Sequence, residues 1–202
     1  MTNFDIAYNE YVKPNEGGYS FVEGDLGGET YAGIARNFHP LWDGWIAIDF
    51  EKRTKYGGSI PWNTKFIGLD ELVKQFYKNL WEKNRLYEVQ SQKLVNLIFD
   101  YIVHSGSAIK NIQKIVGVTP DGIIGPITLA AINANSPDNL FKKILDTRKA
   151  LLIKQGEIES QKKFLSGWLK RLEKFYKEVN PTNHLVLVVI GFIISLIMIS
   201  KK

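Results

Sequence analysis

Apolar residues recur at helical spacing along most of this chain. The clearest stretch runs from Leu69 to Trp81, where apolar side chains form one continuous stripe and Asp70 and Glu71 stand in the first turn. A stripe of this kind predicts an amphipathic helix packed on a core, and acidic residues are favourable at the positive end of the helix dipole. The same spacing predicts further helices over residues 4–11, 42–53, 94–103, 108–116, 126–133, 137–152 and 164–179.

Two features interrupt the helical pattern near the N-terminus. Pro14 disfavours helical geometry at Lys13 and is expected to close the first helix. The segment from Gly17 to Gly33 then contains six glycines with aromatic residues between them. Because glycine punctuates turns and weakens helices, this segment predicts an irregular hairpin or loop. The expected fold class is therefore mainly α with a small β element.

The last apolar run differs from the amphipathic helices. Leu185 to Ile199 is uncharged and almost wholly apolar, interrupted only by Gly191 and Ser195. As a helix, these fifteen residues rise about 22 Å against a hydrocarbon core of about 30 Å, and the flanking residues extend that reach. We interpret residues 185–200 as a transmembrane anchor. The alternative is a buried helix of the core.

Composition narrows the class of protein. The 202 residues are 45% hydrophobic and 12% aromatic, which is typical of a folded chain of one domain or two small ones. The net charge of +5 suits polyanionic surroundings or an ordinary solvated surface. No basic motif interleaved with aromatics supports nucleic acid as a partner. The absence of cysteine excludes disulfides, and the three scattered histidines offer no metal-ligand spacing, so neither a metal nor a cofactor is expected.

The candidate chemistry lies in and just before the glycine-rich segment. Glu16 opens the run Glu-Gly-Gly-Tyr, which ends at Tyr19, and Asp25 and Thr30 follow within the same segment. Two carboxylates and a hydroxyl are the minimum set for hydrolysing a glycosidic bond, with one carboxyl group acting as the acid. The alternatives are an exposed turn residue at Glu16, a turn cap at Asp25 and an ordinary strand residue at Thr30. Glu23 and Glu29 are expected to be exposed charges of the hairpin.

Three motifs carry a resemblance to a known family. They are Glu-Gly-Gly-Tyr from Glu16, Asp-x-Gly-Gly-x-Thr-x-x-Gly-Ile from Asp25, and Asp-Gly-Ile-Ile-Gly-Pro from Asp121. In this order they resemble glycoside hydrolase family 108, over about residues 4–155. That family comprises lysozyme-like N-acetylmuramidases with a C-terminal region called peptidoglycan-binding. The resemblance implies a lysozyme-like fold, with the hairpin near the active site.

The resemblance also implies roles for individual residues. Glu16 would be the general acid, and Asp25 and Thr30 would position water or stabilise charge at the sugar carbon. Tyr19, beside Glu16, would contact substrate. On the predicted buried helix, Asn96 and Asp100 lie four residues apart on one face. They would either bind substrate opposite Glu16 or satisfy a buried polar network, and the sequence leaves both readings open.

These inferences predict a peptidoglycan hydrolase that cleaves the β-1,4 bond between N-acetylmuramic acid and N-acetylglucosamine. We expect a glycoside hydrolase region at 1–92, a helical region packed on it at 93–179, a linker at 180–184 and the anchor at 185–200. The partners would be glycan strands and, through the anchor, the cell membrane. Basic residues before the anchor favour a domain inside the cell, whereas the substrate favours one that faces the wall, which we prefer. The alternative function is a non-catalytic, membrane-tethered peptidoglycan-binding or secretion-accessory protein.

Overall fold

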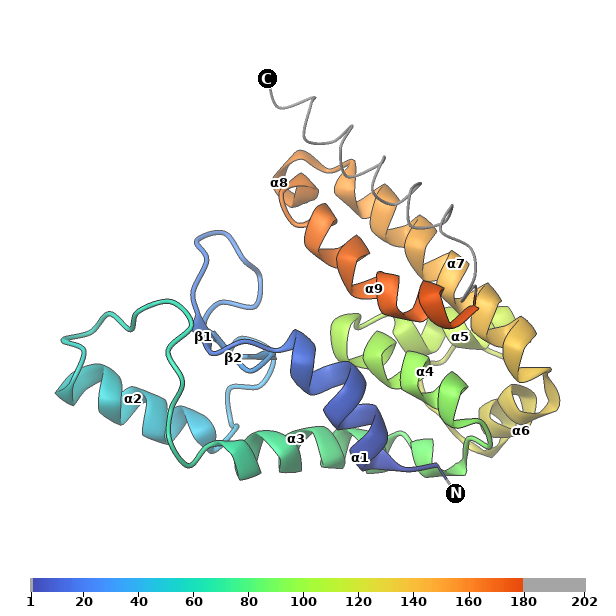
Figure 1. Cartoon of the computed structure of the whole chain (residues 1–202), viewed down its shortest axis with the longest axis horizontal. Helices are drawn as coiled ribbons and strands as arrows, with labels where there is room; N and C mark the ends of the chain where they lie inside the picture. Colours follow the sequence, from blue (N-terminus) through green and yellow to red (C-terminus); the bar gives the residue numbers. More distant parts are fainter. Residues whose placement is uncertain (1, 180–202) are drawn as a thin grey trace. The chain divides into compact units, whose positions relative to one another are not determined.

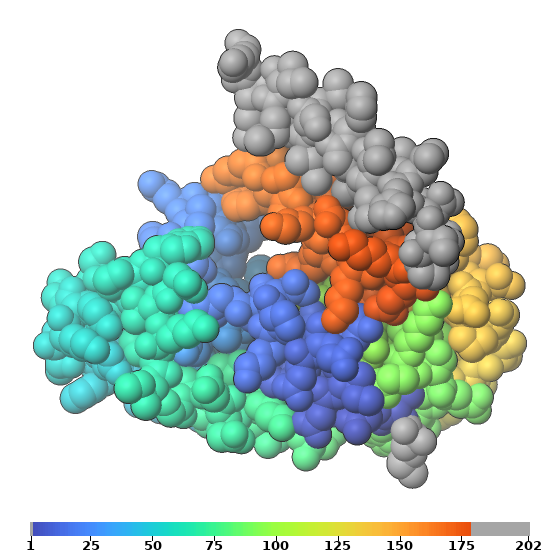
Figure 2. Space-filling view, viewed as in Figure 1, coloured from blue at the N-terminus to red at the C-terminus, as the bar shows by residue number. Residues whose placement is uncertain are grey.

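A computed structural model describes residues 2–179 of the chain. Met1 and residues 180–202, grey in Figures 1 and 2, lie outside this description. The chain divides into two compact units, Met1–Glu88 and Val89–Lys202. Each unit is mainly helical, and a small antiparallel sheet belongs to the first (Figure 1).

The first unit opens with a helical segment whose hydrogen bonding changes along its length. Its first part, α1 (Phe4–Ala7), is capped by Asn3, whose side chain accepts a hydrogen bond from the backbone N–H of Asp5 at 2.8 Å. A π-helical turn, η1 (Tyr8–Val12), and a 3₁₀ turn, η2 (Lys13–Asn15), continue it. Such π turns are frequent at functional sites.

The prediction that Pro14 closes the helix before it is wrong. Lys13 keeps right-handed helical dihedral angles, and Pro14 lies inside the 3₁₀ turn. The π turn explains this, because its wider loop lets the Lys13 N–H donate to the carbonyl of Tyr8. Pro14 then occupies the first turn of η2, where its missing N–H is not needed. The helical path therefore extends to the residue before Glu16.

The glycine-rich segment forms the expected hairpin. Strands β1 (Tyr19–Ser20), β2 (Thr30–Tyr31) and β3 (Ile34–Ala35) make an antiparallel sheet in that order. Ala32 and Gly33 connect β2 to β3, with φ of 47° and 77°. A two-residue hairpin loop with positive φ at both central positions is the turn that matches the natural twist of paired strands.

Helices complete the first unit around an aromatic core. They are α2 (Gly44–Thr54), α3 (Asp70–Lys83) and the 3₁₀ turn η3 (Leu86–Glu88). Most of the stripe predicted from Leu69 to Trp81 lies on the buried side of α3, which presents Tyr77 and Trp81 inward, whereas Leu72 is exposed. The Tyr8 ring packs on the Tyr77 ring at a centroid distance of 5.6 Å. These contacts hold the N-terminal helical segment against α3.

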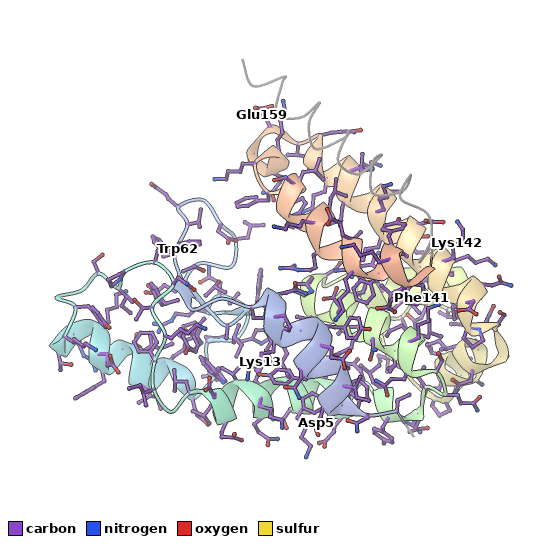
Figure 3. All side chains as sticks on the ribbon, in the orientation of Figure 1. Asp5, Lys13, Trp62, Phe141, Lys142 and Glu159 are labelled. Atoms are coloured by element: carbon purple, nitrogen blue, oxygen red, sulfur yellow. The ribbon has the colours of Figure 1, made fainter. Side chains whose placement is uncertain are left out.

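The second unit is entirely helical over its described part. Its helices are α4 (Gln92–His104), α5 (Ala108–Val116), α6 (Pro126–Ala134), α7 (Pro137–Gly156), α8 (Glu159–Lys162) and α9 (Leu165–Val179). Helix α7 packs against both α4 and α9. Its neighbours Phe141 and Lys142, labelled in Figure 3, illustrate its two faces, since Phe141 is fully buried and Lys142 is exposed.

A buried ion pair joins α4 to α7. Asp100 is fully buried, and its Oδ2 accepts a hydrogen bond from Nη1 of Arg148 at 2.5 Å. Nδ1 of His104 lies 3.4 Å from the other carboxylate oxygen. Burial alone would raise the pKa of Asp100, but His104 and Arg148 together lower it well below its ordinary value. The charged form of Asp100 is therefore a fixed part of this unit.

The predicted fold class needs correction, because it included a transmembrane helix. Among residues 2–179, no helix is long and apolar enough to cross a membrane. The longest of them, α7, carries charged residues along its exposed side, as a helix at a water interface does. The predicted anchor at 185–200 lies outside the described residues. For residues 2–179 the supported fold class is mainly helical with a small sheet, consistent with the lysozyme-like expectation.

We expect Asp100→Asn to lower the free energy of unfolding of the full chain by about 3–5 kcal/mol at pH 7. The reason is that the substitution leaves the buried Arg148 charge without its counter-charge. Because the pKa of Asp100 is lowered on folding, its stabilising effect is present above an unfolded pKa of about 3.9 and is lost as the pH falls below it. The deficit of the variant should therefore shrink in acid.

Denaturant titration at several pH values measures this effect. Asp138→Asn is the control, since Asp138 pairs with Lys93 at 2.8 Å but its side chain is 81% exposed. Solvent screens that pair, so its loss should cost far less. Equal costs for the two variants would contradict a structural role for the buried pair.

Candidate active site

The end of the N-terminal helical segment positions Glu16. Its backbone N–H donates to the carbonyl of Lys13 at 3.2 Å, and its own backbone then turns to extended geometry. The glycines after it allow close packing. A Cβ at Gly18 would lie 2.5 Å from the carbonyl oxygens of both Asn63 and Thr64, so only glycine fits. The Glu-Gly-Gly-Tyr run thus brings the loop at residues 63–64 against the first strand.

The carboxylate of Glu16 lies over the turn between β2 and β3. A Cβ at Gly33 would stand 2.1 Å from Oε2 of Glu16 and 2.5 Å from the hydroxyl of Tyr77. That hydroxyl donates to the carbonyl of Ala32 at 2.7 Å. Helix α3 therefore fixes the turn on which the Glu16 carboxylate rests.

Glu16 lines a cavity of about 110 Å³. Its walls combine apolar and aromatic side chains with charged ones: Tyr8, Tyr31, Val73 and Tyr77, and Lys13, Lys65 and Asp70. Burial, and then the charges of Asp70 and Glu16, raise the pKa of Tyr8 to about 12. Tyr8 therefore keeps its phenolic proton at neutral pH beside Glu16.

Asp25 and Thr30 lie together at a different glycine. Oδ1 of Asp25 accepts a hydrogen bond from the N–H of Gly27 at 2.9 Å. A Cβ at Gly27 would lie 3.5 Å from this oxygen and 3.6 Å from Oγ1 of Thr30. Asp25 lines a second cavity, of about 750 Å³, that does not include Glu16. The predicted trio is thus divided, with Asp25 and Thr30 adjacent and Glu16 in its own cavity.

Sequence reasoning missed Asp70 as a site residue. It begins α3 and lines the Glu16 cavity, so it is a second carboxylate near the predicted acid. In the sequence, Asp70 and Glu71 have the pattern of ordinary acidic residues at a helix start. Only the packing of α3 against the N-terminal segment, through Tyr8 and Tyr77, distinguishes Asp70 from Glu71.

Tyr19 is held by a charge network that the sequence did not predict. Its ring is buried, and its hydroxyl donates to Oε1 of Glu29 at 2.5 Å. Lys52 reaches the same oxygen at 2.5 Å, and Nε of Arg36 lies 3.1 Å from the other. The expectation that Glu29 is an exposed hairpin charge is wrong, because its side chain is only 13% exposed. Its partners lie on and beside α2, which local sequence does not reveal.

Burial and the neighbouring charges have opposite effects on the pKa of Glu29 in this network. Burial by itself would raise the pKa of Glu29, but the hydrogen bonds from Lys52 and Tyr19 and the charge of Arg36 lower it. The pKa of Tyr19 is raised, first by burial and then by its bond to Glu29. Tyr19 therefore remains a neutral phenol whose proton is directed to Glu29, and it lines the larger cavity beside Asp25.

Asn96 and Asp100 belong to the second unit. Asn96 is buried and accepts a hydrogen bond from the side chain of Gln92 at 2.7 Å, and Asp100 forms the ion pair with Arg148. This placement favours the buried polar network among the two alternatives. Their predicted contact with substrate stays a prediction.

The aromatic residues differ in how they are presented. Trp45 is buried, and its indole N–H donates to the carbonyl of His39 at 2.8 Å. Trp42 packs edge-on against Trp45 at a centroid distance of 5.3 Å. Trp62, on the loop after α2, is 70% exposed and lines the larger cavity (Figure 3). It is therefore the tryptophan with a ring face open to a ligand in this cavity.

Comparison with known proteins identifies the family. Residues 9–106 match the family described as Glycosyl hydrolase 108, and residues 107–173 match a Predicted Peptidoglycan domain. Residues 9–106 therefore form a glycosyl hydrolase 108 region. The solved structure of Brucella abortus SagA is similar, with 25% identity and a TM-score of 0.61 over 88% of this chain and 94% of that one. No curated protein matches the chain.

These matches establish the coarse function. A glycosyl hydrolase 108 region followed by a peptidoglycan domain makes the protein a glycoside hydrolase that acts on peptidoglycan. The family match contains Glu16, Asp25 and Thr30, together with the Asp70 cavity wall. It also extends past Glu88 through α4, so the family boundary and the boundary between the compact units differ.

We expect Gly33→Ala to reduce peptidoglycan hydrolysis by about 100-fold, because the added methyl group must displace the Glu16 carboxylate, and small misplacements of catalytic groups have effects of that size. Gly68→Ala is the matched control. Gly68 has a φ of +86°, close to the +77° of Gly33, but a Cβ there meets nothing within 4 Å.

Both variants carry the strain of an alanine at positive φ, about 1–2 kcal/mol. Thermal melting should therefore show destabilisation in each, whereas reducing-sugar release from peptidoglycan should fall steeply only in Gly33→Ala. Similar activity in the two variants would show that the position of Glu16 over Gly33 does not matter for hydrolysis.

Proposed function

We propose that the protein is an N-acetylmuramidase that hydrolyses the β-1,4 bond between N-acetylmuramic acid and N-acetylglucosamine, with Glu16 as the general acid. The observation that carries this proposal is the Glu16 carboxylate, which is held over Gly33 in a cavity lined by tyrosines. The match to the glycosyl hydrolase 108 family supports the reaction class.

Glu16 is suited to deliver a proton to the leaving glycosidic oxygen. Proton donation breaks the bond between that oxygen and the anomeric carbon, and positive charge develops on the sugar. The side chains of Tyr8, Tyr31 and Tyr77 line the same cavity as the carboxyl group. Water then adds to the anomeric carbon and gives up a proton, which completes hydrolysis without any cofactor.

Asp25 and Thr30 are the groups we assign to the water or to the developing charge. The Gly27 N–H fixes one Asp25 oxygen and so orients the carboxylate, and the Thr30 hydroxyl flanks the same glycine. A carboxylate and a hydroxyl held side by side can orient a water molecule for attack. Trp62, exposed in the same cavity, offers an indole face on which a sugar ring can stack.

We expect Glu16→Gln to lower reducing-sugar release from purified peptidoglycan by about 10²- to 10⁴-fold, because the amide cannot donate the proton that the leaving group needs. Glu82→Gln is the control for loss of one carboxylate, since Glu82 is exposed on α3 and pairs only loosely with Lys78, at 4.0 Å. Circular dichroism should show both variants folded.

Full activity in Glu16→Gln would remove Glu16 from the mechanism. A wild-type chain that binds peptidoglycan but releases no sugar would instead favour a non-catalytic binding protein.

A second comparison identifies the carboxylate that works with Glu16. We expect Asp25→Asn to reduce the rate of sugar release by at least about 100-fold, and Asp70→Asn by less than about tenfold, if Asp25 orients water or stabilises charge. Both substitutions remove one exposed carboxylate near the hairpin while keeping its shape, so their effects compare directly. The reverse order of effects would assign the role to Asp70, which shares the Glu16 cavity.

A further inference from the structure

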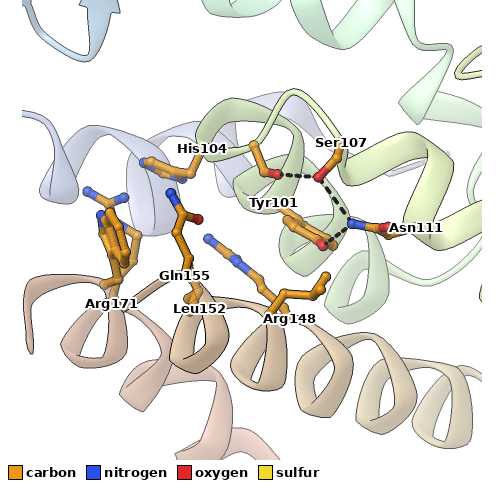
Figure 4. A pocket seen from close by; sticks show the side chains of 11 residues that line it. Tyr101, His104, Ser107, Asn111, Arg148, Leu152, Gln155 and Arg171 are labelled. Atoms are coloured by element: carbon orange, nitrogen blue, oxygen red, sulfur yellow. Dashed lines mark hydrogen bonds between the residues drawn. The ribbon is translucent and has the colours of Figure 1, made fainter. Parts of the chain in front are cut away.

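The second unit contains a polar cavity that plays no part in the proposed hydrolysis. It measures about 320 Å³ and lies among α4, the start of α5, α7 and α9 (Figure 4). Among the described residues, its lining includes two arginines, Arg148 and Arg171, and no carboxylate. The cavity is therefore a place where an anion meets positive charge.

The two arginines differ in how their charge is balanced. Arg148 is almost fully buried and is paired with Asp100 through Nη1. A guanidinium carries five N–H donors, which is more than this one bond uses. Arg171, on α9, has no carboxylate partner within residues 2–179. The excess positive charge of the cavity thus comes from Arg171, with the Arg148 guanidinium nearby as a fixed set of donors.

A chain of hydrogen bonds organises the opposite wall. The Asn111 side-chain amide donates to the Tyr101 hydroxyl at 2.8 Å and to Oγ of Ser107 at 3.2 Å, and the Ser105 and Ser107 hydroxyls lie 3.0 Å apart (Figure 4). Because Tyr101 accepts in this chain, its own proton is available to a ligand. The Asn111 carbonyl oxygen is likewise available to accept from an N–H group.

The remaining lining is apolar or amide. Figure 4 shows Arg148, Leu152 and Gln155 rising from α7 toward the loop that carries Ser107. Trp168, on α9, contributes an indole that stacks on Phe164 at a centroid distance of 6.0 Å. The cavity is therefore lined by positively charged side chains, by side chains that can hydrogen-bond to amides, and by small apolar surfaces.

We propose that this cavity binds the free carboxylate and adjoining amides of a short peptide, the chemistry of the peptide stems that peptidoglycan glycan strands carry. This inference rests on the proposed function, since it gives the hydrolase a second point of contact with the same polymer. The guanidinium group of an arginine binds a carboxylate through strong, charge-assisted hydrogen bonds. Asn111 and Gln155 match peptide amides, and Leu152 and Trp168 suit small side chains such as alanine methyl groups.

A neutral sugar fits this cavity less well. It would leave the Arg171 charge without a counter-charge in a partly enclosed space, which costs free energy. The volume also lies near the lower end of the roughly 300–1,000 Å³ of small-ligand sites, which suits a few residues of peptide. The charge and the volume of the cavity thus suit the peptide better than the glycan.

Calorimetric titration of the full chain with a short synthetic peptide of alanine, whose only carboxylate is at the C-terminus, tests the proposal. The peptide is used with a free C-terminal carboxylate and, in parallel, as the C-terminal amide. Arg171→Gln should weaken binding of the free acid by about tenfold or more, and the amide should bind the wild-type chain equally weakly. Lys170→Gln should bind as the wild type does, because Lys170 is an exposed cation on the same helix that does not line the cavity.

The proposal would be overturned if Arg171→Gln and Lys170→Gln bound the free acid equally well. It would also be overturned if the wild-type chain bound the acid and the amide equally well, or bound neither peptide. Inorganic phosphate that binds through Arg171 while the peptide does not would overturn it as well. Sugar release from glycan stripped of peptides is measured separately. Loss of that activity with intact peptide binding contradicts the glycosidase proposal alone, and the converse result contradicts only the peptide site.

Discussion

The Glu16 carboxylate can occupy its position only because residue 33 has no side chain. A Cβ there would collide with Glu16 and with the Tyr77 hydroxyl, so three separate segments meet at one glycine. Glu16 follows the N-terminal helical segment, and its carboxylate lies over the turn at Ala32–Gly33. Helix α3 stabilises this turn, because the Tyr77 hydroxyl donates a hydrogen bond to the carbonyl of Ala32. Since the turn requires positive φ at both of its residues, the geometry of the sheet and the position of the acid are set together.

Each unit also encloses a charged cluster built from segments far apart in the chain. Glu29 is bound by Lys52, 23 residues away, and Asp100 by Arg148, 48 residues away. Both carboxylates have a lowered pKa despite their burial, so the charged form is the one that packs. Buried pairs of this kind contribute little net stability compared with an apolar core, but losing one partner is costly. Their effect here is to hold the hairpin to α2 and α4 to α7 in fixed register.

The sequence predicted the parts of the fold that depend on local pattern. The helical spacing of apolar residues predicted the helices, and the glycines predicted the hairpin, because both signals lie in residues that are close in the sequence. The errors arose where hydrogen bonds and ion pairs outside the repeating pattern decide. Pro14 continues a helical path because of a π turn before it, and Glu29 is buried because of cations on and beside α2. The transmembrane part of the fold class came from hydropathy alone, and the described helices do not supply such a span.

For the candidate site too, the sequence predicted the residues of the motifs but not the contacts made by packing. Motif spacing singled out Glu16, Asp25 and Thr30, and the structure brings the last two together at Gly27. Spacing could not reveal that Asp70 shares a cavity with Glu16, because that depends on how α3 packs. In the same way, the sequence left Asp100 open between a substrate contact and a buried polar network, and in the structure Asp100 is fully buried.

The boundary between the two matched regions lies between α4 and α5, and contacts of the second unit cross it. The glycosyl hydrolase 108 match ends at residue 106 and includes α4, whereas the compact unit containing α4 begins at Val89. Asp100 lies on one side of the family boundary and Arg148 on the other, so the buried pair spans it. Tyr101 and His104 of α4 likewise form part of the cavity completed by residues of the peptidoglycan domain. Residues 107–173 alone would leave the Arg148 charge without Asp100 and the cavity without one wall. The region at 107–173 is therefore structurally dependent on α4, the last helix of the glycosyl hydrolase 108 match.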